Sequence, residues 1–301
     1  MDTQDLLERY SQGDRNFPSA ILIGSRLVGL VLSYANLSYA NLVNADLTDT
    51  YLVEANLSQA NLTNVNLNRA QLTGANLSFV DLSGADLTEA NLSYASFIQA
   101  HLMDANLISA QCSRADFMGA DLTGAQFIGA DLSHANLEQA NLQDVNLIET
   151  DLRGANLFKV DLSGINLSGT VIDQLTQIDD KWRLVQNVLT QGALGQDLKE
   201  ADFSQANLVG ANFAAANLNG ANFRNARLNG AQFDRATVQG ANFSGAVGLS
   251  KTTQSELQAR GATFIDEFKG ETDQIFSGQD TFRVERITRP TSIETATIKN
   301  L

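Results

Sequence analysis

Cysteine, histidine and long apolar runs are nearly absent from this sequence. Of its 301 residues one is a cysteine, Cys112, so neither a disulfide nor a cluster of thiolate metal ligands can form within the chain. No apolar run approaches the roughly 18 residues that a membrane span needs. The first residues, Met-Asp-Thr-Gln-Asp, lack the basic start and apolar middle of a signal peptide. We therefore expect a cytoplasmic protein without a membrane segment.

Basic residues are in the minority. The chain has 20 Lys and Arg against 34 Asp and Glu, which gives a net charge of −14. Such a surface repels the phosphates of nucleic acids, and the sequence lacks the interleaved aromatic and basic residues of nucleic-acid binding proteins. We expect no direct binding to nucleic acid.

What the sequence has in abundance is a five-residue period. Every fifth residue from Phe17 to Ile172 is large and apolar, and 26 of these 32 positions are Leu. A small residue, usually Ala, precedes most of them by two positions, with Asn or Asp commonly in between, as in Ala35-Asn36-Leu37. This period fits neither a helix, with about 3.6 residues per turn, nor a strand, with a period of about two. The pattern therefore predicts a repeating coil.

The spacing gives each position of the pentapeptide a direction. Residues two apart point to the same side of an extended backbone, so the Ala and the Leu face inward and the Asn or Asp faces outward. The next two residues are commonly Ser or Thr followed by Gly, as in Ser83-Gly84. Gly in that place suits a turn that needs a positive φ. Each pentapeptide is thus predicted to form one short straight side followed by a corner.

This pattern resembles the repeat of the pentapeptide-repeat family, A-(D/N)-L-x-x, over residues 17–172 and 198–248. The resemblance implies an all-β solenoid: a right-handed quadrilateral β-helix with four pentapeptides per coil, to which short capping and inserted α-helices are added. The opening from Leu6 to Phe17 is similar to that of many cyanobacterial members, one of which regulates heterocyst differentiation.

Four sides per coil would place residues that are four pentapeptides apart directly above one another. Phe97 should then stack on Phe117. Two further stacks are expected towards the C-terminus: Phe203, Phe223 and Phe243 on one side, and Phe213 and Phe233 on the opposite side. Such ladders let wide rings fill the interior without clashes.

The interruptions of the repeat divide the chain into segments. We expect an N-terminal capping helix over 3–11, within a segment 1–16, and a second short helix over 252–260 that Gly261 ends. The other segments are a first block of repeats, 17–172; a helical insert, 173–197; a second block, 198–248; a C-terminal cap, 249–268; and a flexible tail, 269–301, in which Phe282, Val284 and Ile287 could pair as an edge strand.

The insert carries a helix predicted over residues 179–189. Ile178, Trp182, Val185 and Leu189 fall on one stripe of it. From Ile172 to Leu198 the chain advances by five pentapeptides and one additional position, so the register shifts. We expect the helix to loop out at a corner and the coil to resume on the next side.

Outward apolar residues define a candidate partner-binding surface, because corners of this fold usually carry Ser, Thr, Asn or Gly. Five such residues belong to one side of the square: Tyr39, Phe79, Ile98, Met118 and Phe158. A large exposed apolar patch usually marks an interface. Trp182 joins the candidates because its helix should emerge beside this side, where it either covers the Phe158 end or docks a partner itself. Other sides carry two smaller sets: Tyr34, Tyr51 and Tyr94 on the adjoining side, and Ile108, Ile128 and Ile148 on another.

Catalysis has little support in the sequence. His101 is at an outward position and His134 at a corner, and neither has a neighbouring nucleophile or carboxylate arrangement. No catalytic residue, metal site or cofactor is expected. The sequence predicts a non-enzymatic scaffold or regulatory protein that acts through a protein partner, with the partner's identity and the oligomeric state left open.

An alternative function is a DNA-mimicking inhibitor or protector of DNA gyrase, because some members of the family resemble DNA in shape and charge. Residues 17–172 carry 15 acidic and five basic residues, whereas residues 198–248 carry three acidic and four basic ones. A duplex mimic should be acidic throughout, and an acidic face also keeps a protein soluble without any partner.

Overall fold

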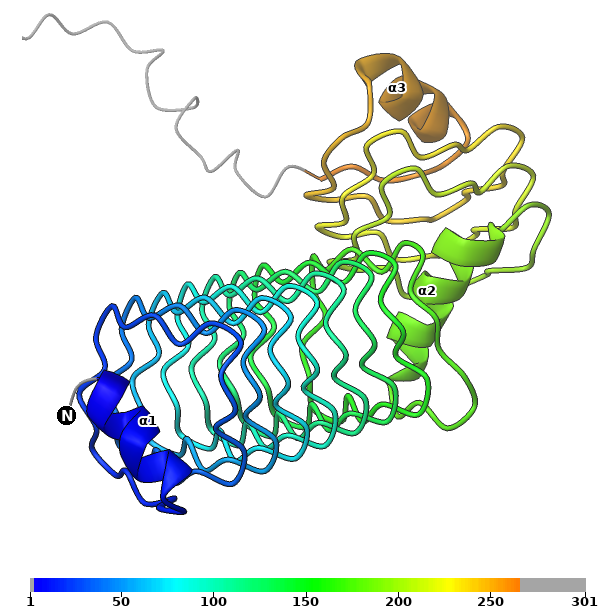
Figure 1. Cartoon of the computed structure of the whole chain (residues 1–301). Coiled ribbons are helices and arrows are strands. Elements are labelled where there is room, and N and C mark those ends of the chain that lie inside the picture. Colours follow the sequence, from blue (N-terminus) through cyan, green and yellow to red (C-terminus); the bar gives the residue numbers. More distant parts are fainter. Residues whose placement is uncertain (1–2, 266–301) are drawn as a thin grey trace, which may run out of the picture. The chain divides into compact units, whose positions relative to one another are not determined.

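The computed structural model describes residues 3–265, which contain three helices among successive coils of backbone (Figure 1). The helices are α1 (Thr3–Ser11), α2 (Asp180–Gln191) and α3 (Lys251–Ala259). All three predicted helices are therefore present, each within two residues of its expected bounds. The predicted tail, 269–301, and the last three residues of the predicted cap lie outside the described residues.

The coils pair with one another at intervals of four pentapeptides. Asn36 forms a parallel bridge with Asn56, and Asn56 forms the next with Asn76. The amide of Leu37 donates to the carbonyl oxygen of Asn56 at 2.7 Å. This interval confirms four pentapeptides per coil. The pairing consists of single-residue bridges, and no longer strand or named sheet occurs within residues 3–265.

The interior of the coils is filled as the spacing predicts. From Leu22 to Leu152 the inward Leu side chains are at most 2% exposed, and the small residues two positions before them are also buried along most of this stretch. Burying a Leu side chain stabilises the fold by about 1.5–3 kcal/mol before entropy is subtracted. One continuous ladder thus forms the core, and each coil contacts only its neighbours along the axis.

The corners are turns whose third residue has a positive φ. The amide of Ala40 donates to the carbonyl of Leu37 at 3.1 Å, and Tyr39 between them has φ +59°. Gly84 has the same conformation, with φ +67°, as the sequence predicts. Many corners nevertheless hold a non-glycine residue there, such as Arg69 at φ +56°. The surrounding ladder therefore holds side chains in a left-handed conformation that costs them about 1 kcal/mol or more.

The outward Asn and Asp side chains hydrogen-bond the corners and one another. The side-chain oxygen of Asn36 accepts from the amide of Ser38 at 3.1 Å, and the Nδ2 of Asn56 donates to the same oxygen at 3.4 Å. In the same way Asp161 accepts from the amide of Ser163 at 2.9 Å. A short side chain with an oxygen acceptor is therefore favoured at this position, which explains why Asn and Asp dominate it.

The predicted ring stacks are confirmed. Phe97 and Phe117 lie with centroids 4.7 Å apart and planes 7° apart. In the second block the two stacks are Phe203, Phe223 and Phe243, with spacings of 5.0 and 4.6 Å, and Phe213 and Phe233, at 5.3 Å. Phe264, within the predicted C-terminal cap, continues the first of these stacks at 5.1 Å from Phe243.

The two terminal helices cover the ends of the described coils. In α1, Leu6 is fully buried and the Tyr10 hydroxyl donates to the carbonyl of Ser33 at 3.0 Å. Next to α3, the guanidinium of Arg260 donates to the carbonyls of Phe233 and Ala236 at 2.9 and 3.0 Å. The contacts to Ser33 and Ala236 satisfy carbonyls that an end coil would otherwise leave unpaired.

The inserted helix α2 packs on the last coil of the first block. Gln186 donates through Nε2 to the carbonyl of Thr170 at 2.7 Å, and Arg183 donates to the carbonyls of Asp173 and Thr176. Its buried side chains are Trp182, Val185, Gln186 and Val188, while Leu189 is only partly buried, so the apolar stripe is rotated slightly from the predicted one.

The register shift has a simple origin. Asn156 pairs with Gln177, one position later than the regular interval, so the additional residue lies between them, before α2 begins. The regular pattern is already restored at Ala193, whose amide donates to the carbonyl of Asn212 at 2.8 Å. Coil pairing therefore resumes at Ala193, one pentapeptide earlier than Leu198, at which we predicted it to resume. Ala193 occupies the position that Leu or Phe usually holds, which hid this side from the pattern.

Candidate partner-binding surface

The candidate surface consists of corner side chains that project outward from successive coils. Tyr39 and Phe79 occupy the positive-φ place of their turns, and Ile98, Met118 and Phe158 the place before it. Phe79 and Phe158 are 55% and 51% exposed, Tyr39 and Met118 are also exposed, and Ile98 is half-buried. The ladder fixes these orientations, because the inward Leu and Ala side chains fill the interior and the corner side chains must point to the solvent.

Three of these residues lie on consecutive coils. The amide of Phe79 donates to the carbonyl of Ile98 at 2.9 Å, and the amide of Gln99 donates to the carbonyl of Met118 at 3.0 Å. Phe79, Ile98 and Met118 therefore form one contiguous apolar surface, which we call the apolar strip.

Tyr39 and Phe158 are separated from the apolar strip by polar coils. Between Tyr39 and Phe79 lies the corner Ser58-Gln59, and the amide of Tyr39 donates to the carbonyl of Ser58 at 3.0 Å. Between Met118 and Phe158 lies the corner Glu138-Gln139, and the amide of Gln139 reaches the carbonyl of Phe158 only at 3.4 Å. The five predicted residues thus share one side without forming one patch.

Trp182 is not part of this surface. It is 6% exposed, with the Lys181 ammonium 4.5 Å from its ring. Lys181 in turn donates to Ser204 at 3.0 Å and lies 3.5 Å from an Asp202 carboxylate oxygen. Trp182 is therefore buried, as the covering interpretation required. The expectation that its helix covers the Phe158 end is wrong, because the Phe158 side chain stays 51% exposed.

Sequence reasoning missed an apolar set on the first coil. Ile21, Ile23 and Val31 are all more than half exposed. Ile21 and Val31 take part in the parallel bridges at places where later coils have mainly Asn, Asp or Gln. That replacement of a polar by an apolar residue is the signal that could have found them.

A second candidate feature is a gap in the pairing near the end of the first block. The regular bonds continue as far as Gln139, whose amide donates to the carbonyl of Phe158 at 3.4 Å, and they resume at Glu149, which donates to Ser168 at 3.1 Å. Between these points, segments 140–147 and 161–166 form neither backbone hydrogen bonds nor bridges with each other. We call this gap the open seam.

The residues of the small inward position explain the seam. Val145 and Ile165 are separated by one full coil and therefore stack, whereas the preceding coils have Ala85, Ala105 and Ala125 in this column. Two β-branched side chains need more room than two alanines, and tightly packed interiors respond to such excess volume by shifting the backbone. Both side chains remain buried.

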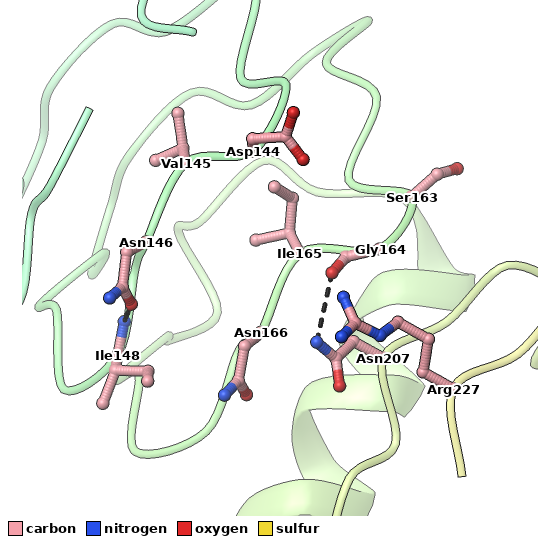
Figure 2. Close-up of a pocket in the computed structure, with 10 residues that line it drawn as sticks. All are labelled: Asp144, Val145, Asn146, Ile148, Ser163, Gly164, Ile165, Asn166, Asn207 and Arg227. Atoms are coloured by element: carbon pink, nitrogen blue, oxygen red, sulfur yellow. Dashed lines mark hydrogen bonds between the residues drawn. The ribbon is translucent and has the colours of Figure 1, made fainter. Parts of the chain in front are cut away.

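Two pockets follow the seam, of about 320 and 250 Å³. We call the two segments that border the seam, 140–147 and 161–166, its lips. Figure 2 shows the larger pocket, with Asp144 and Ile165 on opposite lips and Arg227 of the second block at one end. There the amide of Gly164 donates to the carbonyl of Gln205 at 2.8 Å, and Asn207 donates through Nδ2 to the carbonyl of Gly164 at 3.1 Å.

The titratable groups of the described residues offer little chemistry. His101 and His134 are exposed, and burial raises the pKa of the Cys112 thiol, which keeps it protonated and unreactive. Among residues 3–265 no group of three or more His, Cys, Asp or Glu side chains could hold a metal ion. None of the three helices there has the length and apolar character that crossing a bilayer requires.

Comparison with known proteins identifies the family of this architecture. The model of pentapeptide repeats matches in eight copies, over ranges that together include residues 16–173 and 197–247. The chain belongs to the pentapeptide-repeat family. Among curated proteins no match was found.

Several solved pentapeptide-repeat structures are similar to this chain. HetL, which is involved in heterocyst differentiation regulation in the cyanobacterium Nostoc sp. strain PCC 7120, is 30% identical over 82% of this chain and 97% of HetL, with a TM-score of 0.30. A protein of the Arabidopsis thaliana thylakoid lumen is 33% identical over 32% of this chain and 66% of its own, with a TM-score of 0.31. QnrB1, a plasmid-mediated fluoroquinolone resistance protein, is 22% identical over 54% and 86%, with a TM-score of 0.38.

Proposed function

We propose that this pentapeptide-repeat protein is a non-enzymatic scaffold or regulatory protein of the cytoplasm that binds a protein partner through the apolar strip. We propose further that its coils form the right-handed quadrilateral β-helix of the family. The supporting observation for function is the continuity of Phe79, Ile98 and Met118 across three coils. Contiguous exposed apolar side chains favour protein association, whereas isolated ones do not require an explanation.

The rigidity of the support adds to this proposal. Each residue of the apolar strip is held by a corner whose backbone is hydrogen-bonded to the next coil. A partner therefore meets a surface that loses little conformational entropy on binding.

A triple substitution tests the apolar strip. Phe79→Asn, Ile98→Ser and Met118→Ser place corner residues that the family uses, and Asn tolerates the positive φ at position 79. We expect the wild-type protein to retain a specific partner from a lysate of the source organism and the triple variant to lose it, as measured by quantitative mass spectrometry.

A matched control exists on another side of the coils. Ile108, Ile128 and Ile148 are half-buried corner residues on three consecutive coils, as Ile98 is, so replacing them by Ser removes a comparable apolar set. The control variant should retain the partner. If both variants keep the same set of proteins, the apolar strip is not the binding surface.

The gyrase-directed alternative is favoured by the charge of the first block, with 15 acidic and five basic residues. It predicts inhibition of supercoiling by gyrase at micromolar protein or below, and loss of that inhibition when Asp81, Asp121 and Asp161 are replaced by Asn. Such a result would replace the proposal above.

A further inference from the structure

We propose that the open seam binds an extended segment of a partner protein, which adds as a strand and carries lysine or arginine opposite Asp144 and Asp161. This inference shares with the proposed function only the premise that the chain binds protein. It concerns a different surface and a different mode of recognition.

The first argument is the set of backbone groups on the two lips. Within residues 3–265, five amides and five carbonyls of the seam make no hydrogen bond. The amides are those of Leu142, Asp144, Leu147, Asp161 and Asn166, and the carbonyls are those of Ala140, Val145, Asp161, Ser163 and Asn166. Unpaired donors and acceptors at ladder spacing are the feature by which an exposed edge accepts another strand.

The second argument is that the seam opens without loss of backbone pairing. Neighbouring strands normally lie about 4.8 Å apart, so an inserted strand needs about twice that separation. Elsewhere in the first block such a separation would break the bonds between coils. At the seam these bonds are already absent. Separating the two lips therefore breaks no backbone hydrogen bond between them and disturbs the packing of Val145 and Ile165.

The third argument is charge. Hydrogen bonds from the hydroxyl and the amide of Ser163 lower the pKa of Asp161, which keeps this lip anionic. Asp144 lies on the other lip, and the first block as a whole has an excess of ten acidic residues. Among the residues that line the two pockets, Arg227 is the one cation. A strand with basic residues over the two aspartates and an acidic group towards Arg227 is therefore complementary.

The experiment uses a labelled synthetic peptide of eight residues, in which lysine and threonine alternate and the last residue is aspartate. Fluorescence anisotropy with the full chain should show saturable binding. The same peptide with N-methyl groups on alternate amides should bind about tenfold more weakly or worse, because it loses several backbone hydrogen bonds while keeping its charge. Equal binding of the two peptides would show that attraction is merely electrostatic and would overturn the proposal.

Variants of the protein localise the site. Val145→Ala with Ile165→Ala gives the seam the alanines of the paired coils, so it should close and bind the peptide about tenfold more weakly or worse. The control Val65→Ala with Val80→Ala makes the same kind of change where the coils are fully paired and should leave binding unchanged. Unaltered affinity in the first variant would refute the assignment.

A second variant keeps the test decisive if the double alanine protein does not fold, as judged by circular dichroism. Asp144→Lys changes an exposed side chain and should weaken the peptide to a similar degree, whereas an unchanged affinity contradicts the proposal. The triple variant of the apolar strip should bind the peptide normally. Failure of the seam therefore does not imply failure of the proposed function, and the converse also holds.

Discussion

Phe223 is the side chain whose replacement tests the aromatic ladder most directly. Its ring stacks on Phe203 at 5.0 Å and on Phe243 at 4.6 Å, and it meets Phe213 and Phe233 edge-on at 5.5 and 5.9 Å. It is therefore the centre of one stack of the second block and contacts both rings of the other.

Replacement by Leu isolates the ring contacts, since Leu fills the same position in most other coils. Aromatic pairs contribute about 0.5–1.5 kcal/mol beyond the area that they bury. With two stacked and two edge-on partners, Phe223→Leu should lower the free energy of unfolding by about 2–6 kcal/mol. The matched control is Phe127→Leu, because Phe127 has one ring partner, Phe117, at 6.0 Å. Its cost should be about 0.5–1.5 kcal/mol.

Urea unfolding followed by circular dichroism measures the difference, with the same variants compared at one protein concentration. Because coils contact only their neighbours, the loss should appear in the transition of the second block when the two blocks unfold separately. Equal destabilisation by the two substitutions, or a larger effect of Phe127→Leu, would refute the argument that the stacked rings stabilise the second block.

Three further predictions concern the core, the insert and pH. Leu122→Asp places a carboxylate in a fully buried position and should lower the free energy of unfolding by several kcal/mol. The loss should be larger at pH 7 than at pH 4, because burial raises the pKa of the new carboxyl group. An unchanged melting temperature would mean that residue 122 does not face inward. Trp182→Ala should cost about 3–5 kcal/mol, and the wild-type tryptophan should show blue-shifted emission that acrylamide quenches slowly; intact stability would contradict its burial. The lowered pKa of Asp161 means that its contribution to stability is present above the unfolded value of about 3.9 and is lost as pH falls through the folded value; thermal melts of wild type and Asp161→Asn should converge at low pH, and parallel curves would exclude this linkage.

Much of the molecule could be predicted because one rule repeats. The inward Leu, the small Ala and the outward Asn of units such as Ala35-Asn36-Leu37 follow from the spacing alone, and the ring stack of Phe97 on Phe117 follows from four sides per coil. These features depend on contacts within one pentapeptide or between adjacent coils, so the repeat and its coil interval are sufficient to predict them.

The seam and the insert could not be predicted in the same way. The crowding of Val145 and Ile165 becomes visible only when residues one full coil apart are compared, because each residue alone is an acceptable inward side chain. The stripe that contains Trp182 predicts burial without saying against which surface. The packing of α2 on Thr170 depends on one additional residue between Asn156 and Gln177, and the sequence does not show where that residue is accommodated.

The interval of four pentapeptides between paired coils also limits how the length of this chain can change. Deleting or duplicating four consecutive pentapeptides removes or adds one complete coil, and every column of side chains beyond the change keeps its neighbours. A change of a single pentapeptide preserves which side chains face inward but turns everything that follows by a quarter of a coil. Met118 would then leave the face of Phe79, and the ring of Phe117 would no longer meet that of Phe97. Insertions and deletions that preserve the surfaces should therefore be whole coils, that is, multiples of four pentapeptides.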